Sequence, residues 1–377
     1  MSRQSTVDTR QGLVDRLRAA GDEGRPVRFS GAGTKLKWGS PVEAEPLAVE
    51  ACEIHEHNAG DLTAVVDAAL SLHELQETLA EEGQMLALDP PLGDEARATI
   101  GGIVAASDSG PLRHRYGSAR DLVVGMTVAL SDGTVAQSGG KVIKNVAGYD
   151  LSKLFTGSYG TLGAILKLSL RLHPLSPENA TAVGRSSDPA ALAAAALELS
   201  HARIELQSLD ARWEDGAGAV LARFGGTRAS APADDAAETM KRHGLQTEVS
   251  ADDAEWWGDQ REAQRSDSGV VVRVSGVQSQ LATVLELARD LDARVVGRAG
   301  LGLSWITLPN SGDPVPTVDD LRRELAPSPC VVLDAPDPVR ASLDVWGPRD
   351  PGATLLAQRV RERFDPAGIC APGLMGR

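Results

Sequence analysis

The sequence predicts an α+β protein with two domains, and three observations support this prediction. Two glycine-rich segments, residues 28–35 and 98–105, each adjoin a short apolar run. Downstream of residue 176, stretches typical of helices alternate with stretches typical of strands, which favours a two-layer α+β architecture. The chain has 377 residues, which is long for a single hydrophobic core.

The N-terminal part of the chain is predicted to form two helix–strand units. An amphipathic helix over 11–20 is followed by a short strand over 27–29, which leads into the first glycine-rich segment. A second helix is expected over 62–82, with Asp61 as its N-cap, and a strand over 85–88 follows it.

Residues 100–174 have a different pattern, in which glycines recur between strand-like runs. The sequence 131–134, Ser-Asp-Gly-Thr, is typical of a hairpin turn. These features predict a second sheet with one short helix over 151–156 and strands over 122–124, 127–130, 135–137 and 164–172.

Residues 176–190 are interpreted as a polar linker, because they carry two prolines and few apolar side chains. An antiparallel sheet with helices is predicted beyond the linker. Its expected helices cover 189–202, 232–243, 278–291 and 317–325, and its expected strands cover 204–212, 219–224, 270–274, 294–296, 303–308 and 330–333. A last amphipathic helix is expected over 351–364.

Composition excludes several classes of partner. The net charge of −14 argues against nucleic acid and against an anionic membrane surface. No apolar run approaches the length of a membrane span, and residues 1–10 are polar, without the apolar stretch of a secretory signal. The three cysteines are far apart and contain no Cys-x-x-Cys pair, which argues against an iron–sulfur cluster held by this chain and favours the reducing cytoplasm.

The two glycine-rich segments favour a phosphate-bearing ligand. Glycine lets the backbone approach a ligand closely, and successive bare N–H groups form an anion-binding nest. Two such loops facing each other suit the diphosphate of a dinucleotide. A Rossmann motif is excluded, because Leu36 stands where its third glycine would be, and no P-loop sequence occurs.

A third segment, residues 144–165, shows which kind of dinucleotide protein this is. Its sequence KNVAGYDLSKLFTGSYGTLGAI, together with the two glycine-rich segments and YGSARDLVVG at 116–125, resembles the flavoproteins with a PCMH-type FAD-binding domain, also called the vanillyl-alcohol oxidase type. The tail FDPAGICAPGLM at 364–375 resembles the family's closing motif. The resemblance is specific for 1–175 and 345–377 and loose between them. The closest likeness within the family is to the FAD-binding subunits of bacterial glycolate oxidase complexes.

The resemblance implies an architecture and a cofactor site. Two FAD-binding subdomains at 1–175 would be followed by a cap domain at 176–345 and by a C-terminal return to the FAD domain at 346–377. FAD would lie between the subdomains. The residues implied to contact it are Ser30, Gly31, Ala32, Gly33, Thr34, Lys35, Pro91, Thr99, Ile100, Gly101, Gly102, Ala105, Ser107, Tyr116, Gly117, Arg120, Asp121, Lys144, Asn145, Gly148, Tyr149, Asp150, Gly163 and Ile165.

The resemblance also implies an activity: oxidation of a small 2-hydroxy acid by hydride transfer to flavin. In such an assembly a second flavin subunit and an iron–sulfur subunit are partners, and electrons pass to a partner subunit. A stand-alone FAD-dependent dehydrogenase of another small alcohol, or a non-catalytic assembly subunit, are the alternatives.

Two departures from the family pattern affect the chemistry. Some members attach FAD covalently through a histidine in the first loop, whereas Thr34 stands at or near that position here, so FAD is expected to be non-covalent. Members that oxidise 2-hydroxy acids often carry clustered cap histidines, but this cap has only His201 and His243, far apart. The sequence therefore assigns no metal site and no catalytic residue.

Several side chains have more than one interpretation. Arg120 could neutralise flavin charge or pair with Asp121. His114 is interpreted as a surface histidine, and most tryptophans as core residues. The cap arginines Arg223, Arg261 and Arg273 are candidates for a substrate carboxylate, with none preferred.

Overall fold

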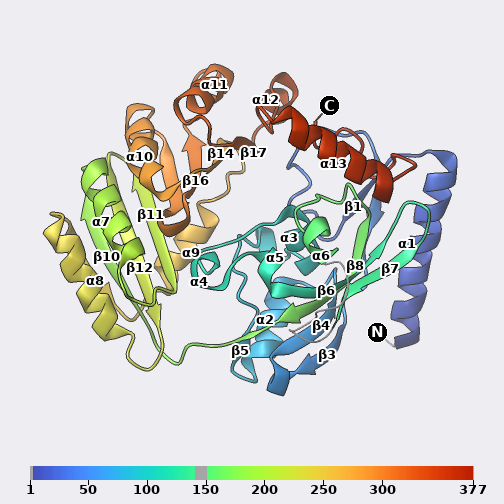
Figure 1. Ribbon diagram of the computed structural model, residues 1–377, viewed down its shortest axis with the longest axis horizontal. Helices are drawn as coiled ribbons and strands as arrows, with labels where there is room; N and C mark the ends of the chain where they lie inside the picture. Colours follow the sequence, from blue (N-terminus) through green and yellow to red (C-terminus); the bar gives the residue numbers. More distant parts are fainter. Residues whose placement is uncertain (1–2, 141–150, 377) are drawn as a thin grey trace.

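The structure, a computed structural model, describes residues 3–140 and 151–376 and has two lobes side by side (Figure 1). The first lobe is built on a five-stranded sheet, and the second, called the cap lobe here, on an eight-stranded sheet. Helix α13 (Pro351–Phe364) lies across the top of the first lobe in the view of Figure 1.

The sheet of the first lobe is antiparallel throughout and buried on both faces. Helix α1 (Arg3–Glu23) covers one face through Leu13, Val14 and Leu17. Helices α2 (Leu72–Ala80) and α3 (Ile100–Ala106) pack into the core on the other face. The strands, in sheet order, are β3 (Ile54–Asn58), β4 (Thr63–Asp67), β8 (Ala164–Arg171), β6 (Val123–Ala129) and β7 (Val135–Gly139).

The ends of the chain meet beside this sheet. Strands β1 (Val27–Ser30) and β2 (Glu45–Ala48) are parallel neighbours, and Val27 also bridges to Cys370 of the tail. The ring of Phe364 on α13 packs edge-on against Phe155, with ring centroids 5.6 Å apart. The return of the C-terminus to the first lobe is therefore confirmed. The lobe's shorter elements are η1 (Ala59–Asp61), β5 (Gln84–Met85), η2 (Asp94–Ala96), α4 (Arg113–Tyr116), α5 (Ala119–Leu122), α6 (Ser152–Phe155) and β9 (His173–Pro174).

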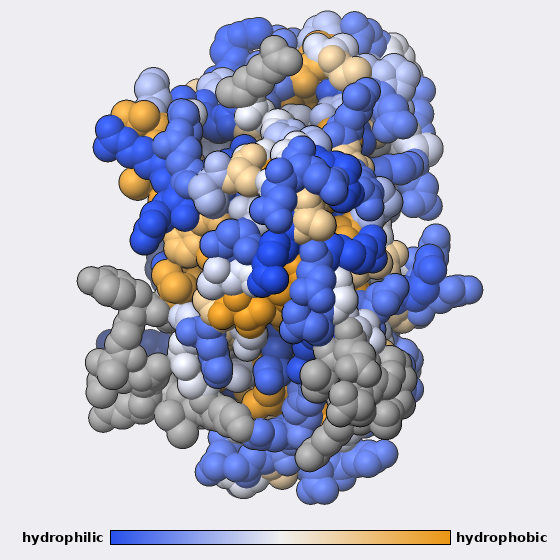
Figure 2. All heavy atoms as spheres, turned by 90° about the vertical axis from the view of Figure 1, so that its right-hand side faces the viewer, coloured by the Kyte–Doolittle hydropathy of each residue, from blue (hydrophilic) through white to orange (hydrophobic). Residues whose placement is uncertain are grey.

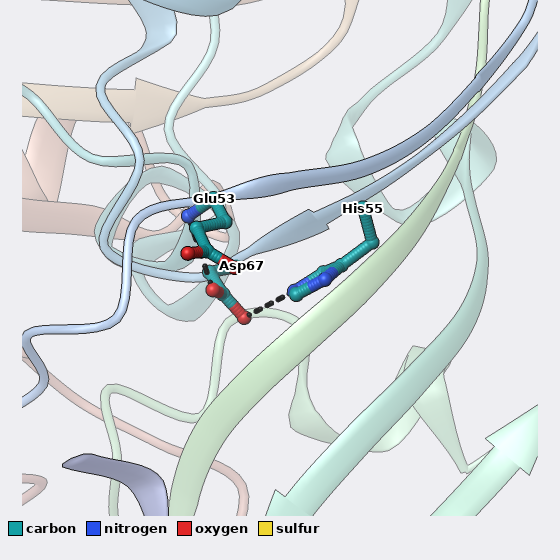
Figure 3. A group of neighbouring side chains, drawn as sticks. All are labelled: Glu53, His55 and Asp67. Carbon is teal, nitrogen blue, oxygen red and sulfur yellow. Dashed lines mark hydrogen bonds and ion pairs between the residues drawn. The ribbon is translucent and has the colours of Figure 1, made fainter. Parts of the chain in front are cut away.

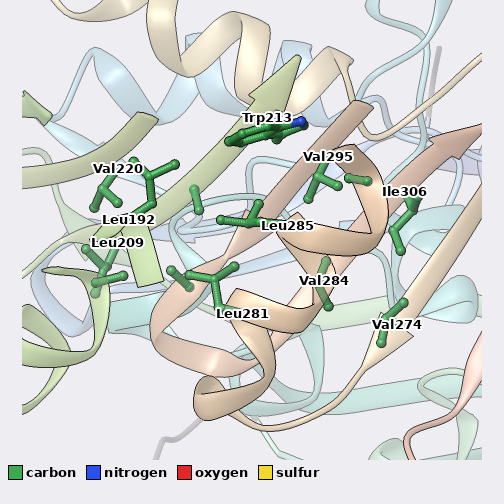
Figure 4. Close-up of a cluster of buried hydrophobic side chains, with 14 of the residues drawn as sticks. Leu192, Leu209, Trp213, Val220, Val274, Leu281, Val284, Leu285, Val295 and Ile306 are labelled. Carbon is green, nitrogen blue, oxygen red and sulfur yellow. The ribbon is translucent and has the colours of Figure 1, made fainter. Parts of the chain in front are cut away.

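The cap lobe has helices on one face of an antiparallel sheet and the first lobe against part of the other. Its strands, in sheet order, are β13 (Gln246–Ser250), β10 (Asn179–Ser186), β12 (Ala217–Gly225), β11 (Ser208–Glu214), β15 (Arg294–Arg298), β16 (Leu303–Leu308), β14 (Val270–Ser275) and β17 (Cys330–Asp334). Its main core lies under α7 (Pro189–His201), α8 (Ser230–Arg242), α10 (Leu281–Asp290) and α11 (Pro314–Glu324), and Figure 4 shows part of this core around Leu285 and Trp213. The opposite face carries α9 (Ala254–Glu262), and η3 (Gln278–Gln280), η4 (Ala299–Leu301) and α12 (Asp337–Ser342) complete the lobe.

The α+β class and the antiparallel sheet of the cap are confirmed, but several local predictions are wrong. The described residues of 100–174 contain the four helices α3 to α6 rather than one, and the strands expected over 122–124 and 127–130 are the single strand β6.

The helix expected over 62–82 is strand β4 followed by α2, and Ser71 rather than Asp61 is the N-cap of that helix. Strand β4 is buried along its whole length, so it lacks the alternation that marks a half-buried strand.

The polar linker expected over 176–190 is also a wrong interpretation. Strand β10 lies within it and pairs with β12 on one side and β13 on the other. Its alanine- and glycine-rich sequence has weak strand propensity, and the sheet around it supplies the stability.

In the described part of the chain, no helix combines the length and apolarity that a bilayer crossing requires. The face of the molecule in Figure 2 is covered mainly by hydrophilic side chains, with apolar groups near its centre.

Candidate functional site

The two glycine-rich segments face each other across a hollow in the first lobe. A Cβ on Gly31 would lie 2.5 Å from Thr99 Oγ1, so a larger residue there would push the segments apart. The third segment adds to the contact, because the Tyr159 N–H donates to Ala105 O at 2.8 Å. Three separate stretches of sequence therefore meet at one place.

The second segment forms the N-cap and most of helix α3. Thr99 is the N-cap of α3, and its hydroxyl accepts a hydrogen bond from the Gly102 N–H. Gly101 is needed for packing, because a Cβ there would lie 2.7 Å from the Ala68 side chain. Gly102 faces the hollow, and among the described residues a Cβ there would meet Thr99, at 3.1 Å from its Oγ1.

The hollow consists of two adjoining cavities of about 440 and 500 Å³. Most of the first-segment and second-segment residues predicted to contact the cofactor line them. The predicted residues found there are Ser30, Gly31, Gly33, Thr34, Lys35, Thr99, Gly101, Gly102, Ala105, Gly163 and Ile165. Sequence reasoning missed Phe29, Tyr159 and Gly160, although the last two lie inside the quoted third segment.

Other predicted contact residues are not among those that line the two cavities. Ile100 and Pro91 are buried, and Ser107 is the C-cap of α3. Tyr116 packs on His173, and Ala32 lies between residues that line the second cavity. Gly117 has a positive φ after α4. Lys144, Asn145, Gly148, Tyr149 and Asp150 lie outside the described residues.

Pairing with Asp121 is one of the two interpretations of Arg120, and in the described part of the chain Asp121 instead caps helix α5. The Asp121 carboxylate accepts hydrogen bonds from the Ser118 N–H and hydroxyl, at 2.8 and 2.9 Å. Arg120 itself is exposed.

Lys35 places a cation beside the hollow. Its Nζ lies 3.3 Å from Asp108 Oδ2, and the two side chains are 8% and 5% exposed. Burial lowers the pKa of Lys35, and the Asp108 carboxylate opposes that shift. The pair joins the loop after the first segment to the loop after α3.

Arginines from both lobes face each other next to the hollow. Burial, and then the neighbouring Arg273 of β14, lower the pKa of Arg113. Among the described residues, neither guanidinium forms an ion pair, and Arg273 Nε and the Tyr159 hydroxyl are buried without a hydrogen-bond partner. Burial raises the pKa of Tyr159, and Arg273 opposes the shift. The Asp121 carboxylate opposes the pKa shift of Arg113, so it offsets part of the positive charge that the two arginines bring to the boundary between the lobes.

Two carboxyl groups at the same boundary have raised pKa values. Asp210 of β11 pairs with the fully buried Arg298 and accepts from Gln260 at 3.0 Å, and burial raises its pKa to about 6. Burial raises the pKa of Asp89 in the first lobe to about 7, although Arg261 and Arg298 oppose that shift.

His114 is not the surface residue that the sequence suggests. Its ring lies against Gly300 of the cap lobe, and its Nδ1 is buried without a partner in the described part of the chain. Burial lowers its pKa, so the neutral imidazole is favoured.

A separate group of side chains in the first lobe has the residue types of a metal site. Glu53, His55 and Asp67 bring their ligand atoms within 4.8 Å of one another (Figure 3). Arg10 already places a cation there, because its guanidinium donates to Asp67 Oδ1 at 2.5 Å. We therefore assign no metal to this group.

Comparison with known proteins identifies the class of the first lobe. Residues 5–139 match the model of an FAD binding domain family, so this part of the chain is an FAD-binding domain and FAD is its cofactor.

Curated relatives match over part of their length. The chain is 36% identical to glycolate oxidase subunit GlcE of Escherichia coli (strain K12) over 169 residues, which are 44% of this chain and 48% of that protein. It is 35% identical to a D-lactate dehydrogenase of Archaeoglobus fulgidus over 160 residues, 42% of this chain and 35% of the relative. Glycolate oxidase subunit GlcD of Bacillus subtilis (strain 168) is 34% identical over 155 residues, 40% of this chain and 32% of the relative. The matches thus span about half of these relatives or less.

A solved structure extends the likeness to the whole fold. Alkyldihydroxyacetonephosphate synthase superposes with a TM-score of 0.66 at 15% identity, over 96% of this chain and 74% of that one. The chain therefore has the PCMH-type FAD-binding fold, with a cap lobe.

Proposed function

We propose that the hollow between the glycine-rich segments holds the diphosphate of a non-covalently bound FAD. The lining fits such a group, because side chains would fill the space that Gly31 and Gly102 leave open. Thr34, in place of a histidine, supports non-covalent binding. FAD would supply the two-electron acceptor, and the chain would bind and orient it.

We further propose that the chain oxidises a small 2-hydroxy acid whose carboxylate binds between Arg113 and Arg273. Neither arginine has an ion-pair partner among the described residues, and this observation supports the substrate class. A guanidinium recognises a carboxylate with two parallel hydrogen bonds. Tyr159 lines the hollow and neighbours Arg273, so an acid held there would lie beside the cofactor.

The apolar surfaces around this position would exclude water. Trp38, Ala106 and Tyr159 of the first lobe pack against Val271, Trp305 and Leu333 of the cap sheet. Low local polarity strengthens the attraction between the arginines and a carboxylate. Two relatives are named as subunits of glycolate oxidase, which supports an assembly. As the resemblance of the sequence implies, we propose that this chain works beside a second flavin subunit and an iron–sulfur subunit that receives electrons. The domain boundaries at 175 and 345 are part of the proposal, as is a cytoplasmic location, which the three free cysteines support.

The first experiment is an absorbance spectrum of the purified chain, followed by anaerobic addition of glycolate or D-lactate. Flavin bands that bleach support oxidation by this chain. Bands that persist after addition of each of the two acids favour the assembly-subunit alternative. Bleaching by other alcohols, but by neither acid, favours the stand-alone dehydrogenase. Arg273→Gln should raise the acid concentration for half-maximal bleaching about tenfold or more, while flavin content stays that of the wild type.

Gly102→Val tests the place of the diphosphate. The valine methyl groups would enter the hollow, and no backbone strain opposes the substitution, so FAD should be lost while the fold remains. The matched variant is Gly12→Ala on α1, where a Cβ meets nothing within 4 Å, and it should retain FAD. Full flavin occupancy in Gly102→Val would contradict the placement.

A further inference from the structure

The loop from Thr34 to Gly39 is held by residues of both lobes. Within the first lobe, Lys35 pairs with Asp108, and Arg28 donates to the Trp38 carbonyl at 3.1 Å.

The cap lobe adds further contacts to this loop. Trp38 Nε1 donates to Asp334 Oδ1 at 2.9 Å, and Asp334 stands at the end of β17. Arg265, which follows α9, binds Asp334 with two hydrogen bonds of 2.7 and 3.0 Å and donates to the Thr34 carbonyl at 3.3 Å. Its guanidinium also lies 4.9 Å from the centre of the Trp38 ring.

Burial makes these contacts strong. The Asp334 side chain is 7% exposed and the Trp38 side chain is buried, so the indole N–H depends on Asp334 for its hydrogen bond. Asp334 also accepts from Arg265 and from the Ser266 N–H at 3.2 Å. Another cap residue also holds the loop, because the buried Arg340 donates a hydrogen bond of 2.7 Å to the Gly39 carbonyl. The loop from Thr34 to Gly39 is thus fixed at both ends from the other lobe.

The same loop lines the cavity. Thr34 and Lys35 belong to its wall, and the Thr34 carbonyl is the atom that Arg265 holds. Asp334, Trp38 and Arg340 are not among the lining residues of either cavity. Among the described contacts, the loop therefore connects Asp334 to the cavity wall.

We propose that Asp334, with Arg265 and Trp38, is a positioning group that sets the affinity for FAD from the cap lobe. This inference rests on the proposed location of the cofactor. According to this inference, the cap lobe contributes to cofactor binding as well as to substrate binding. Displacement of the cap lobe from the loop would therefore weaken FAD binding. The group acts by holding the Thr34–Lys35 backbone in the conformation that lines the cavity.

The molecule contains a matched control. Arg223 and Asp253 form an equivalent pair inside the cap lobe, with two hydrogen bonds of 2.9 and 3.0 Å and an Asp253 side chain 5% exposed. Trp257 lies 5.8 Å from that guanidinium. None of these three residues lines the cavities.

The test is titration of the flavin-free full chain with FAD, followed by flavin fluorescence, for Asp334→Asn and Asp253→Asn. Loss of a charged hydrogen-bond partner should raise the FAD dissociation constant of Asp334→Asn about tenfold. Asp253→Asn should lower the melting temperature comparably but leave FAD affinity within twofold of wild type. Equal FAD affinities in the two variants would overturn the proposal.

A milder pair of variants keeps the test decisive if Asp334→Asn does not fold. Trp38→Phe removes the N–H donor to Asp334 and keeps a ring, and Trp257→Phe removes the donor to Thr181 Oγ1 in the same way. Only Trp38→Phe should weaken FAD binding, and an unchanged affinity overturns the proposal. Gly102→Val in the same titration separates the two ideas: if it binds FAD as wild type does, the cavity assignment fails. If Gly102→Val loses FAD while Asp334→Asn and Asp253→Asn bind FAD with equal affinity, only the positioning role of Asp334 fails.

Discussion

Two clusters of the same composition occupy different places in this molecule. One joins Trp38, Arg265 and Asp334 across the boundary between the lobes, and the other joins Trp257, Arg223 and Asp253 within the cap. In each, a buried carboxylate binds an arginine through two hydrogen bonds, and an indole lies near the guanidinium. The arginine–carboxylate pairing is the same, although Trp38 donates to Asp334 itself and Trp257 donates to Thr181 Oγ1. The main difference between the clusters is therefore what each one connects.

The two clusters join different elements, so the loss of each should have different consequences. The internal cluster ties α9 to strands β10 and β12, since Asp253 also accepts from the Thr181 hydroxyl at 2.8 Å. It therefore stabilises one lobe. The bridging cluster fixes a cavity-lining loop of the first lobe to β17, at the far edge of the cap sheet. Its loss should affect both stability and the ligand.

The largest predicted effect that tests this comparison comes from removing the indoles. Trp38→Ala and Trp257→Ala each empty a fully buried site and should each lower the free energy of unfolding by about 3–5 kcal/mol. Denaturant titration of the flavin-free chain measures that loss. Saturating FAD should recover less stability in Trp38→Ala than in Trp257→Ala, because ligand stabilisation scales with affinity.

If FAD raised the free energy of unfolding of both variants by the same amount, the two clusters would not differ in their effect on FAD binding. That result would mean that the bridging indole acts on packing alone. Retention of the wild-type melting temperature in the absence of FAD by either variant would also contradict the burial argument.

Local sequence features explain why the cavity was predictable and the bridging cluster was not. The two glycine-rich segments lie in short stretches with a distinct composition, and close backbone approach is a local property of residues such as Gly31 and Gly102. Trp38, Arg265 and Asp334 are far apart in the chain, and nothing in their neighbours marks them. Their meeting depends on how the two lobes pack.

The same reasoning applies to the wrong local predictions. Strand β4 is buried on both sides, so its apolar run carries no period that separates strand from helix. Strand β10 is weak in propensity, and β12 and β13 decide its conformation. His114 follows the same rule, because its ring lies against Gly300 of the cap lobe, which is distant in sequence. Tertiary contacts override sequence signals at each of these positions.

A smaller predicted effect concerns an interface carboxyl that has no arginine partner. Burial raises the pKa of Asp89 to about 7, so the folded state favours its protonated form. The stability that this provides is present at acid pH and is lost as the pH rises from about 4 through about 7. Asp89→Asn should remove this loss and should be more stable than wild type at pH 8 by about 1–2 kcal/mol, since the residue keeps some exposure.

Denaturant titrations at pH 5 and pH 8 measure this effect. The difference between variant and wild type should grow with pH, whereas a mere packing change would give the same difference at both values. A variant that is less stable than wild type at pH 8 would show that the ionised carboxylate is stabilised by Arg261 and Arg298 more than burial destabilises it.

The smallest predicted effect separates the role of a contact across the lobe boundary from the role of its burial. Arg115 of the first lobe and Glu205 of the cap lobe form an ion pair of 3.3 Å across the same boundary, but their side chains are 41% and 86% exposed. Water and salt screen such a pair, so Glu205→Gln should change the free energy of unfolding by less than about 0.5 kcal/mol and leave FAD affinity unchanged. If Glu205→Gln weakened FAD binding as Asp334→Asn does, any contact between the lobes would suffice to hold the loop. An unchanged affinity would attribute the effect of Asp334 to its buried, two-bonded geometry beside the cavity loop.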